Sequence, residues 1–336
     1  MAAAVSARRN GADVIIAEHD PLPGGVLNRC IHHGFGLGYF GEDLTGTEYA
    51  ARFRSQLMVP GIRVFTSAAV LSLSEDASAL LSSAAGLVRV RFRSCILASG
   101  SMEMTLSGVP VAGTRPEGIY TAGCLQGLLN TGGWEIKGRT IEERAVRSPD
   151  TDGWIGHSQD TDGWIGHSPD TGRRIRRSLD LGEHIVILGS GNVGQIMGRQ
   201  LIMAGKHIDA MIEQNEHPGG LARNRRECIE AFKIPLKLCA TITCIHGYRH
   251  IQAVTVKDLK TGRTEKIKCD TLITALGLIP DRTLIQPLIK NGSAPSWLHL
   301  AGNCDTIHDI VDSATIQGER IGQLAASASH RQAAPL

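Results

Sequence analysis

The stretch HIVILGSGNVGQIMGRQLIMAGKHIDAMIE, residues 184–213, decides the fold. It holds a β-branched run, the pattern Gly189-x-Gly191-x-x-Gly194, apolar residues at helical spacing, and a second apolar run that ends at Glu213. These patterns predict a strand over 184–188, a helix over 193–204 and another strand over 207–212. Strand, glycine turn, helix, strand and carboxylate in this order are typical of a Rossmann dinucleotide-binding unit.

The three glycines of this stretch have separate expected roles. Gly189 allows the tight turn, Gly191 lets the backbone approach a pyrophosphate, and Gly194 lets the helix pack close to the strand. The start of the helix offers unpaired N–H groups and a partial positive charge to the phosphates. The alternative is a glycine-rich turn that holds no ligand. The residues expected to bind the nicotinamide cofactor are Gly189, Ser190, Gly191, Asn192, Val193, Gly194 and Glu213.

Glu213 bears on the choice between NAD and NADP. It lies 24 residues after Gly189, where a carboxylate can accept hydrogen bonds from both ribose hydroxyls. The same charge would repel a 2′-phosphate, so NAD is expected and NADP is less favoured. Arg223, Arg225 and Arg226 follow ten or more residues later and weaken that preference.

The residues after Glu213 continue the alternation of helix and strand. The further elements expected are a helix over about 221–232 and extended runs at 235–238, 251–259 and 265–275. The last run leads through Gly277 into Pro280, which ends the block.

The first half of the sequence repeats this plan without its opening. Residues 2–10 predict a helix of small residues, and residues 13–17 predict a strand that ends at Glu18. Neither a strand nor a G-x-G-x-x-G pattern precedes the helix, so the first Rossmann unit is expected to be truncated before its glycine loop. A buried strand over 93–98 ends on Ser99-Gly100, as the strand before Gly277 does in the second half.

A tandem repeat separates the two halves. The sequence PDTDGWIGHS at 149–158 recurs as QDTDGWIGHS at 159–168 and begins again at 169. Ten-residue copies are too short for a solenoid, and their Asp, Gly and Ser content predicts a flexible surface loop. The run Asp150-Thr151-Asp152-Gly153 resembles the start of a calcium loop, but the remaining ligands are missing, and no metal site is expected.

The overall composition excludes several classes of partner. The chain has 336 residues, of which 42% are hydrophobic, and its formal net charge of +2 gives no reason to expect nucleic acid. No apolar stretch approaches the roughly 18 residues that span a bilayer, so no membrane span is expected and the location is expected to be cytoplasmic. The eight cysteines show no C-x-x-C spacing, which argues against a zinc knuckle, a short redox disulfide and an iron–sulfur cluster within this chain.

Several long and unusual segments point to one family. They are EHDPLPGGVLNRCIHHGFG at 18–36, CILASG at 95–100, TRPEGIYTAG at 114–123, residues 185–194, PGGLARN at 218–224, residues 270–280 and AGNCDTIHDIVD at 301–312. On these segments the chain resembles the FAD-dependent pyridine nucleotide (disulfide) oxidoreductases. Within them it is most similar to the FAD-dependent oxidoreductases encoded beside anaerobic glycerol-3-phosphate dehydrogenase and to the flavoprotein subunits of opine oxidase and cyanide synthase. The resemblance covers nearly the whole chain apart from about 139–181.

The resemblance implies an FAD site in the first unit. Glu18 would hold the adenosine ribose of FAD, and Ser99 with Gly100 would lie at the edge of the cofactor. Gly302 and Asn303 would bring the backbone against the ribityl chain and the phosphate. The full set of residues expected at this site is Glu18, Gly24, Gly25, Asn28, Ser99, Gly100, Gly277, Gly302, Asn303 and Asp309.

Three histidines are the candidate catalytic residues. By resemblance, His32 and His33 lie with Asn28 on a loop near the isoalloxazine ring, where a proton carrier is useful at neutral pH. His308 and Asp309 would open the last helix, whose positive end can stabilise negative charge on reduced flavin. The alternative for the loop histidines is that they only form hydrogen bonds with the backbone.

The predicted architecture is α/β, with two Rossmann-like domains of the FAD/NAD(P)-binding, three-layer ββα type, the first strand of the FAD domain being absent. The FAD-binding domain is expected to be discontinuous, over 1–138 and 277–330. An insert that contains the repeat is expected over 139–181, and the NAD(P)-binding domain over 182–276.

The expected activity is transfer of a hydride between NAD(P)H and FAD, with onward electron transfer to a small-molecule substrate or a partner. The resemblance implies that this partner could be a dehydrogenase or an iron–sulfur subunit. One alternative is a truncated, non-catalytic NAD-binding fragment that lacks stable FAD binding. Another is a chain that does not fold stably, because the absent strand would remove buried apolar area.

Overall fold

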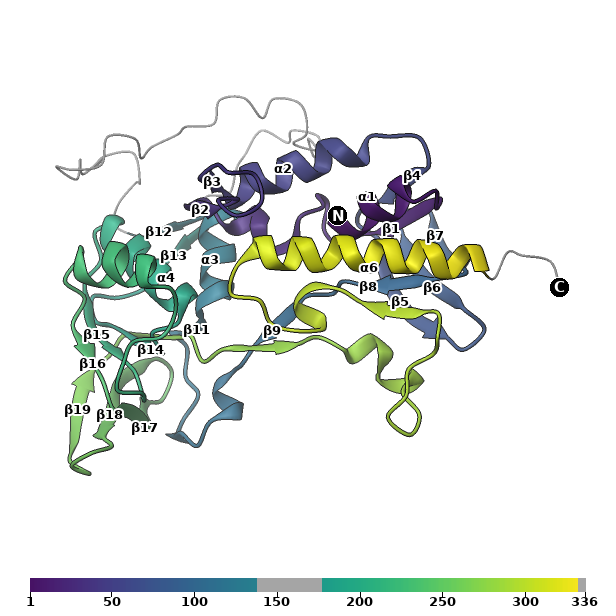
Figure 1. Ribbon diagram of the computed structural model, residues 1–336. Coiled ribbons are helices and arrows are strands. Elements are labelled where there is room, and N and C mark those ends of the chain that lie inside the picture. The colour runs from purple at the N-terminus through teal and green to yellow at the C-terminus, as the bar shows by residue number, and fades with distance from the viewer. Residues whose placement is uncertain (138–176, 332–336) are drawn as a thin grey trace. The chain divides into compact units, whose positions relative to one another are not determined.

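The computed structural model describes residues 1–137 and 177–331, and the chain divides into two compact units (Figure 1). Unit 1 combines Met1–Met102 with Leu278–Leu336, and unit 2 is the segment Glu103–Gly277. The chain passes between the units twice, and the short strands β9 (Ser101–Glu103) and β21 (Leu278–Pro280) pair at these passages. The tandem repeat and most of the insert expected over 139–181 lie outside the described residues.

A five-stranded parallel sheet forms the centre of unit 2. Its strands, in spatial order, are β11 (Ile119–Thr121), β20 (Thr271–Thr274), β14 (Ile185–Leu188), β15 (Ile208–Ile212) and β16 (Leu236–Lys237). β14 lies in the middle and pairs in parallel with β20 and β15. The strands expected at 184–188 and 207–212 therefore form, and they are neighbours in the sheet.

The remaining elements of unit 2 flank this sheet. Its helices are α3 (Ala122–Asn130), α4 (Asn192–Met203) and α5 (Ala222–Asn224), with the helical turns η2 (Leu106–Gly108) and η4 (Arg225–Glu230). A four-stranded sheet contains β10 (Ala112–Gly113), β17 (Ala240–Gly247), β18 (Ile251–Asp258) and β19 (Thr264–Lys268). A separate pair consists of β12 (Trp134–Ile136) and β13 (Arg177–Leu179).

Side chains on the central strands alternate between two hydrophobic cores, as a strand period of two requires. Val186 of β14 is fully buried among residues of β17 and β18. Its neighbour Ile187 is fully buried on the other face, among residues of α3 and α4. The layers are therefore the four-stranded sheet, the parallel sheet and the helices, which confirms the predicted ββα arrangement.

Unit 2 extends beyond the segment 182–276 that the sequence predicted for the second domain. β11 pairs with β20, and Leu125 of α3 is fully buried in the same core as α4, so residues 103–137 belong to unit 2. The last residues of the expected insert also differ from the prediction, because β13 pairs with β12 and Leu181 is fully buried. These short strands find partners far along the chain, and local sequence patterns do not carry that information.

Unit 1 is built from the two ends of the chain. Its helices are α1 (Ala2–Arg9), α2 (Gly46–Leu57) and α6 (Val311–Arg331), with the 3-10 turns η1 (Gly25–Arg29), η5 (Thr283–Leu288) and η6 (Gly302–Cys304). Its strands are β1 (Val14–Ala17), β2 (His33–Phe35), β3 (Leu44–Thr45), β4 (Ile62–Phe65), β5 (Ala69–Ser74), β6 (Ser78–Ser83), β7 (Gly86–Arg91), β8 (Cys95–Leu97) and β22 (Leu298–Leu300). β1 pairs in parallel with β4, and β8 pairs in parallel with β22. β5, β6 and β7 form an antiparallel sheet.

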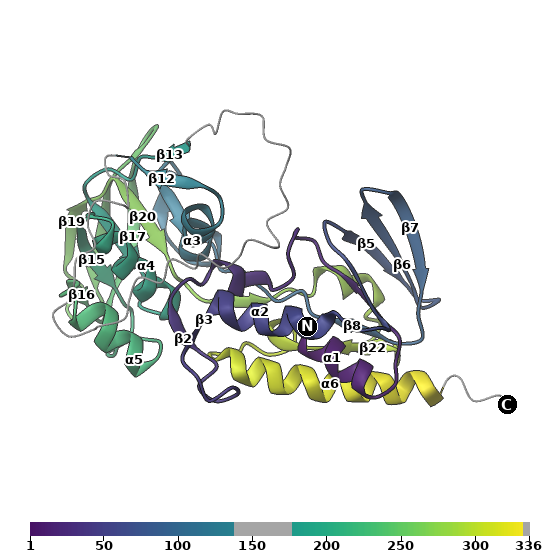
Figure 2. The same ribbon diagram turned by 90° about the horizontal axis from the view of Figure 1, so that it is seen from above.

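Helices α1 and α6 run side by side in unit 1 (Figures 1 and 2). Small residues make this approach possible. A Cβ built on Gly322 would lie 2.2 Å from the carbonyl oxygen of Ala3, whereas one built on Gly318 would meet only ordinary contacts at 3.5 Å. The alanine-rich start of α1 therefore packs against the glycine positions of α6.

α6 contains 21 residues, among them Glu319 and Arg320. Neither it nor any other helix in the described part of the chain combines the length and the apolar character needed to cross a membrane.

Candidate functional site

The glycine turn of unit 2 joins β14 to α4 and lies close to Ala275, which follows β20. Gly189 has a φ of +99°, and a Cβ built on it would lie 2.2 Å from the carbonyl oxygen of Ala275. A Cβ built on Gly194 would lie 2.8 Å from the Cβ of the same alanine. A side chain at either position would push α4 away from the sheet. These contacts agree with the roles expected of the first and third glycines.

Gly191 differs from the other two because it borders open space. It is the N-cap of α4, with φ −66° and ψ 171°, and a Cβ built on it would have no atom within 4 Å. Asn192 and Val193 are the first residues of the helix, and no side chain caps it. The N–H groups of the first turn and the positive end of a 12-residue helix therefore lie at a space that a diphosphate could fill.

Glu213 lies behind this loop and is only 6% exposed. Its Oε2 accepts hydrogen bonds from the backbone N–H (3.1 Å) and the hydroxyl (2.5 Å) of Ser190. Its Oε1 accepts from the backbone N–H (2.9 Å) and the side-chain amide (2.8 Å) of Asn215. The carboxylate that was expected to hold the ribose thus has four protein donors.

The segment Pro218–Asn224 folds over the start of α4. Asn192 Oδ1 accepts from the backbone N–H of Leu221 at 2.7 Å and from Nδ2 of Asn224 at 2.9 Å. The Gly219 N–H donates to the Ser190 hydroxyl at 2.9 Å. The PGGLARN segment is therefore part of the wall of the candidate nucleotide site.

Three arginines within or just after this segment are paired with glutamates. Arg223 Nε lies 2.9 Å from Glu227 Oε1, and Arg226 Nη2 lies 3.9 Å from the same oxygen. Arg225 Nε lies 3.4 Å from Glu230 Oε1. A 2′-phosphate would have to compete with these carboxylates for the guanidinium groups.

In unit 1, two of the expected FAD segments follow paired parallel strands. Ser99 and Gly100 come after β8, and Gly302 comes after β22, so both segments emerge at the carboxyl ends of neighbouring strands. Ligands of open α/β sheets bind at such edges. Gly100 (φ +79°) and Gly302 (φ +73°) have no atom within 4 Å of a built Cβ, so a ligand can approach the backbone at both. The Ser99 hydroxyl donates to the carbonyl oxygen of Asp281 at 2.7 Å.

Gln317 of α6 organises the loop after β22. Its Oε1 accepts from the Gly302 N–H at 2.8 Å and lies 3.0 Å from Nε2 of His308. Its Nε2 donates to Asp305 Oδ2 at 2.8 Å, which fixes the orientation of the amide. Because Oε1 can only accept, His308 must carry its proton on Nε2. Asn303 Oδ1 also accepts from the His308 N–H at 3.0 Å.

The last helix begins later than expected. α6 starts at Val311, so His308 and Asp309 precede it and do not form its first turn. His308 is held in the loop by Gln317 and Asn303 instead, and Asp309 is exposed.

Glu18, Gly24, Gly25 and Asn28, which were expected to bind FAD, lie in the segment that follows β1. Glu18 follows β1, and its Oε1 accepts from the Asp20 N–H at 2.9 Å. Gly24 (φ +141°) and Gly25 (φ +55°) form the turn that leads into η1. Asn28 holds this turn, because its Nδ2 donates to the Leu22 carbonyl at 3.0 Å and its Oδ1 accepts from Arg54 at 2.9 Å.

His32 and His33 each use one ring nitrogen on the backbone. His32 Nδ1 lies 2.9 Å from the carbonyl oxygen of His33, and His33 Nδ1 lies 3.0 Å from that of Asp43. A carbonyl oxygen only accepts, so both rings carry a proton on Nδ1. These contacts are the ones expected if the loop histidines only form hydrogen bonds with the backbone. In each neutral ring, a proton on Nδ1 makes Nε2 the basic nitrogen. Gly277, the last residue of unit 2, accepts from the Met104 N–H at 2.9 Å.

Some residues of these sites carried no sequence signal. Gln195 is fully buried in α4, and its Nε2 donates to the carbonyl oxygens of Ser190 (2.6 Å) and Gly219 (2.7 Å). Asp312 of α6 accepts from the Gly38 N–H at 2.7 Å. Gln317 and Asn215 also carried no sequence signal. Polar residues on helices and turns are common, and only the contacts in the folded protein single these two out.

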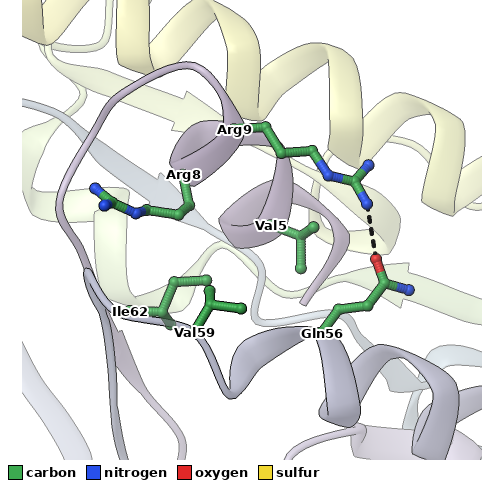
Figure 3. Close-up of a pocket in the computed structure, with 6 residues that line it drawn as sticks. All are labelled: Val5, Arg8, Arg9, Gln56, Val59 and Ile62. Carbon is green, nitrogen blue, oxygen red and sulfur yellow. Dashed lines mark hydrogen bonds between the residues drawn. The ribbon is translucent and has the colours of Figure 1, made fainter.

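A hollow of about 180 Å³ in unit 1 contains none of the predicted site residues. Figure 3 shows its lining, which consists of Val5, Arg8, Arg9, Gln56, Val59 and Ile62. Arg9 donates to Gln56 Oε1 at 3.0 Å, and Arg8 pairs with Asp13 at 3.0 Å. Because protein groups already bind both guanidinium groups, the hollow points to no ligand.

Comparison with protein families identifies the class. The model of the pyridine nucleotide-disulphide oxidoreductases matches residues 1–294. The chain belongs to this family, whose members bind FAD and use NAD(P)H, and it is an FAD-dependent, NAD(P)-linked oxidoreductase. The family predicted from the sequence is thereby confirmed. A search of curated proteins gave no match.

Solved structures share the fold over nearly the whole chain. Thioredoxin reductase of T. acidophilum has a TM-score of 0.65 at 18% identity, covering 99% of this chain and 94% of that one. Lactococcus lactis thioredoxin reductase (FR conformation) has a TM-score of 0.66 at 14% identity, with 98% and 95% covered. The bacillithiol disulfide reductase Bdr (YpdA) of Bacillus cereus has a TM-score of 0.60 at 13% identity, with 97% and 95% covered. At these identities the likeness concerns the fold alone.

Proposed function

We propose that this protein passes a hydride from NADH to FAD and then delivers electrons to a small-molecule substrate or a partner subunit. The observation that carries the proposal is the open space at Gly191, in front of an uncapped helix within a complete strand–turn–helix–strand unit. That space, the helix N–H groups and the positive helix end suit a diphosphate. A partner dehydrogenase or an iron–sulfur subunit is the proposed recipient if electrons leave the chain.

Unit 1 supplies the proposed FAD site. Its support is the pair of glycines, Gly100 and Gly302, that follow strands β8 and β22 and leave the backbone open to a ligand. Glu18 after β1 is the proposed ribose ligand, and its Oε1 accepts a hydrogen bond from the Asp20 N–H beyond the end of that strand. FAD, when bound, supplies the redox chemistry, and the chain contributes binding, orientation and charge.

His308 is the proposed proton-handling residue next to this backbone. Gln317 holds the proton on Nε2 of His308, which leaves Nδ1 as the basic nitrogen of the neutral ring. His32 and His33 are proposed to take part by the resemblance alone, and Nδ1 of each lies within hydrogen-bond distance of a backbone carbonyl.

We propose NAD rather than NADP as the nicotinamide cofactor. Glu213 places a negative charge behind the glycine loop, and the nearby Arg223 and Arg225 are paired with Glu227 and Glu230. A 2′-phosphate near this cluster would lie close to the carboxylates. The guanidinium groups of Arg223 and Arg225 are already paired with those carboxylates. This arrangement disfavours the extra phosphate electrostatically.

Electrons are proposed to leave the flavin without passing through thiols of this chain. The solved relatives include reductases of thioredoxin and of bacillithiol disulfide. In this chain all eight cysteines are free and no two have C-x-x-C spacing. The proposed substrate is therefore one that accepts or donates electrons at the flavin itself.

Spectroscopy of the purified protein tests the proposal. After incubation with FAD and removal of the excess, the protein should absorb near about 450 nm, and NADH without oxygen should bleach the band. A matched sample given NADPH should bleach more slowly. Colourless protein that still binds NADH would support the non-catalytic fragment instead. Yellow protein that neither NADH nor NADPH reduces would contradict the proposed hydride transfer.

A further inference from the structure

The carboxylate of Glu213 is saturated by groups of the protein. Ser190 gives its N–H and hydroxyl to one oxygen, and Asn215 gives its N–H and amide to the other. An ionised carboxylate offers about four acceptor positions, so ribose hydroxyls would have to displace an existing donor. We propose that Glu213 is a positioning residue that fixes the phosphate-binding loop, and that it is not the ribose ligand. This inference rests on the proposed binding of NADH by unit 2.

A relay connects Glu213 to the segment that covers the site. The Ser190 hydroxyl donates to Glu213 and accepts from the Gly219 N–H at 2.9 Å. Ser190 is fully buried, so water cannot replace either partner without opening the loop. The carboxylate therefore ties the glycine turn to the PGGLARN segment as well as to the turn at Asn215.

A second, independent tie joins the same two segments. Gln195 Nε2 donates to the carbonyl oxygens of both Ser190 and Gly219, at 2.6 and 2.7 Å. Gln195 is fully buried, and its Oε1 has no hydrogen-bond partner among the described residues. The side-chain amide of Gln195 therefore links the glycine turn to the PGGLARN segment without the help of Glu213. The hydrogen bonds of Ser190 and Gln195 both hold the glycine turn against the PGGLARN segment.

The two roles of Glu213 predict different effects on nucleotide binding. A ribose ligand adds more affinity for a nucleotide that carries the adenosine 2′-hydroxyl than for the 2′-deoxy analogue, which keeps only the 3′-hydroxyl of that ribose. A positioning residue adds affinity for every dinucleotide whose diphosphate meets the loop. The comparison of NADH with its 2′-deoxyadenosine analogue separates them, and it avoids NADPH, whose extra charge would respond to Glu213 in either case.

Glu213→Gln is the informative substitution because all four partners are donors. The amide replaces two acceptor positions by two N–H groups, which face donors of Ser190 or Asn215. Ser190→Ala is the second variant, since it removes the relay to Gly219 and leaves the carboxylate in place. Glu117→Gln is the matched control: Glu117 belongs to unit 2, its side chain is 79% exposed, and it forms an exposed ion pair with His250.

Dissociation constants of the full-length variants decide between the roles. In both Glu213→Gln and Ser190→Ala, affinities for NADH and for the 2′-deoxy analogue should fall in parallel, each by about tenfold. The ratio of the two affinities should stay as in the wild type, and Glu117→Gln should change neither affinity. The inference is overturned if Glu213→Gln abolishes the discrimination between the two nucleotides while Ser190→Ala binds both normally.

Amide hydrogen exchange in nucleotide-free protein gives a readout that does not depend on binding. The N–H groups of Gly219 and Asn215 should exchange faster in Glu213→Gln than in the wild type. Unchanged protection of both would also overturn the inference. If the wild type binds no dinucleotide, the proposed function fails, and the exchange rates still decide whether Glu213 holds the loop. Should Glu213→Gln not fold, Ser190→Ala carries the same comparison.

Discussion

Asp270 shows how one carboxylate of unit 2 couples ionisation to stability. Its Oδ2 accepts from the backbone N–H groups of Glu183 (3.0 Å) and His184 (3.1 Å). Burial raises the pKa of Asp270, but these two N–H groups and nearby positive charge outweigh burial and hold the pKa below its ordinary value. A lowered pKa in the folded state means stability that is present above the unfolded pKa and lost as pH falls through the folded one.

Asp270→Asn should therefore lower the free energy of unfolding at neutral pH by about 1–3 kcal/mol, the range for hydrogen bonds to a charged group. The difference from the wild type should shrink as the pH falls below about 4, where the aspartate of the wild type becomes protonated. Urea unfolding at about pH 7 and about pH 3 measures both values. A difference that is the same at the two pH values would contradict this account.

Single residues of the candidate sites divide into those with a local signal and those without one. The turn at Gly189 and the start of α4 after Gly191 were predictable because strand, turn and helix are contiguous in the sequence. The partners of Glu213 were not, since a carboxylate after a strand fits a ribose ligand and a loop clamp equally well. Gln317 gave no signal at all, because its importance comes from contacts with a loop about fifteen residues earlier.

At the level of secondary-structure elements, the packing of α1 on α6 depends on one close contact. Gly322→Ala would bring a Cβ to 2.2 Å from the Ala3 carbonyl oxygen and force the helices apart. We expect it to cost about 1–3 kcal/mol of stability, as overpacking usually does. Thermal unfolding measures the loss.

Gly318→Ala is the control on the same helix, four residues earlier. Its Cβ would meet the first residues of α1 at an ordinary 3.5 Å, and alanine favours a helix over glycine by about 1 kcal/mol. This variant should be as stable as the wild type or more so. Equal losses in Gly318→Ala and Gly322→Ala would show that the close contact does not control the packing.

Elements with strong periodicity were predictable, and those defined by distant pairing were not. The helix expected over 193–204 forms as α4, and the strand expected at 13–17 forms as β1. β17 was not foreseen, because its threonines, cysteine, histidine and glycine lack strict alternation. The antiparallel sheet of β5, β6 and β7 also went unpredicted, because serines interrupt the apolar residues of β5 and β6 and the residues of β7 are mostly exposed.

At the scale of the whole molecule, the chain order predicted two units and the discontinuity of the first. The division falls at 102 rather than at 138, because β11 and α3 pack into the core of unit 2. Residues 103–137 carry no signal for either unit in isolation. The assignment of β11 and α3 follows from their partners β20 and α4, which lie far along the chain, and one sequence cannot supply such pairings.

The thiols of the whole chain give a further prediction. Burial raises the pKa of Cys30 to about 12, of Cys269 to about 12 and of Cys228 to about 11. Thiols of this kind stay protonated and react slowly at neutral pH. Cys124 is exposed, and it should be the first cysteine modified by a thiol reagent in the native protein.

Mass spectrometry after brief labelling identifies the modified cysteine, and unfolding in urea should release the buried ones. Cys124→Ala should keep the NADH-dependent reduction of flavin, because no thiol pair is assigned to the electron path. Loss of flavin reduction in that variant, or a native disulfide in the oxidised protein, would contradict the proposed route.

The start of α4 is proposed to bind the diphosphate of NADH at Gly191. Gly191→Val tests it most directly, because the backbone there is extended and a Cβ meets no atom within 4 Å, so the fold should survive. The side chain would fill the space assigned to the diphosphate. We expect the melting temperature to change by no more than about 2–4 °C and the affinity for NADH to fall by more than about tenfold. Gly191→Val that melts like the wild type and binds NADH with unchanged affinity would contradict the claim.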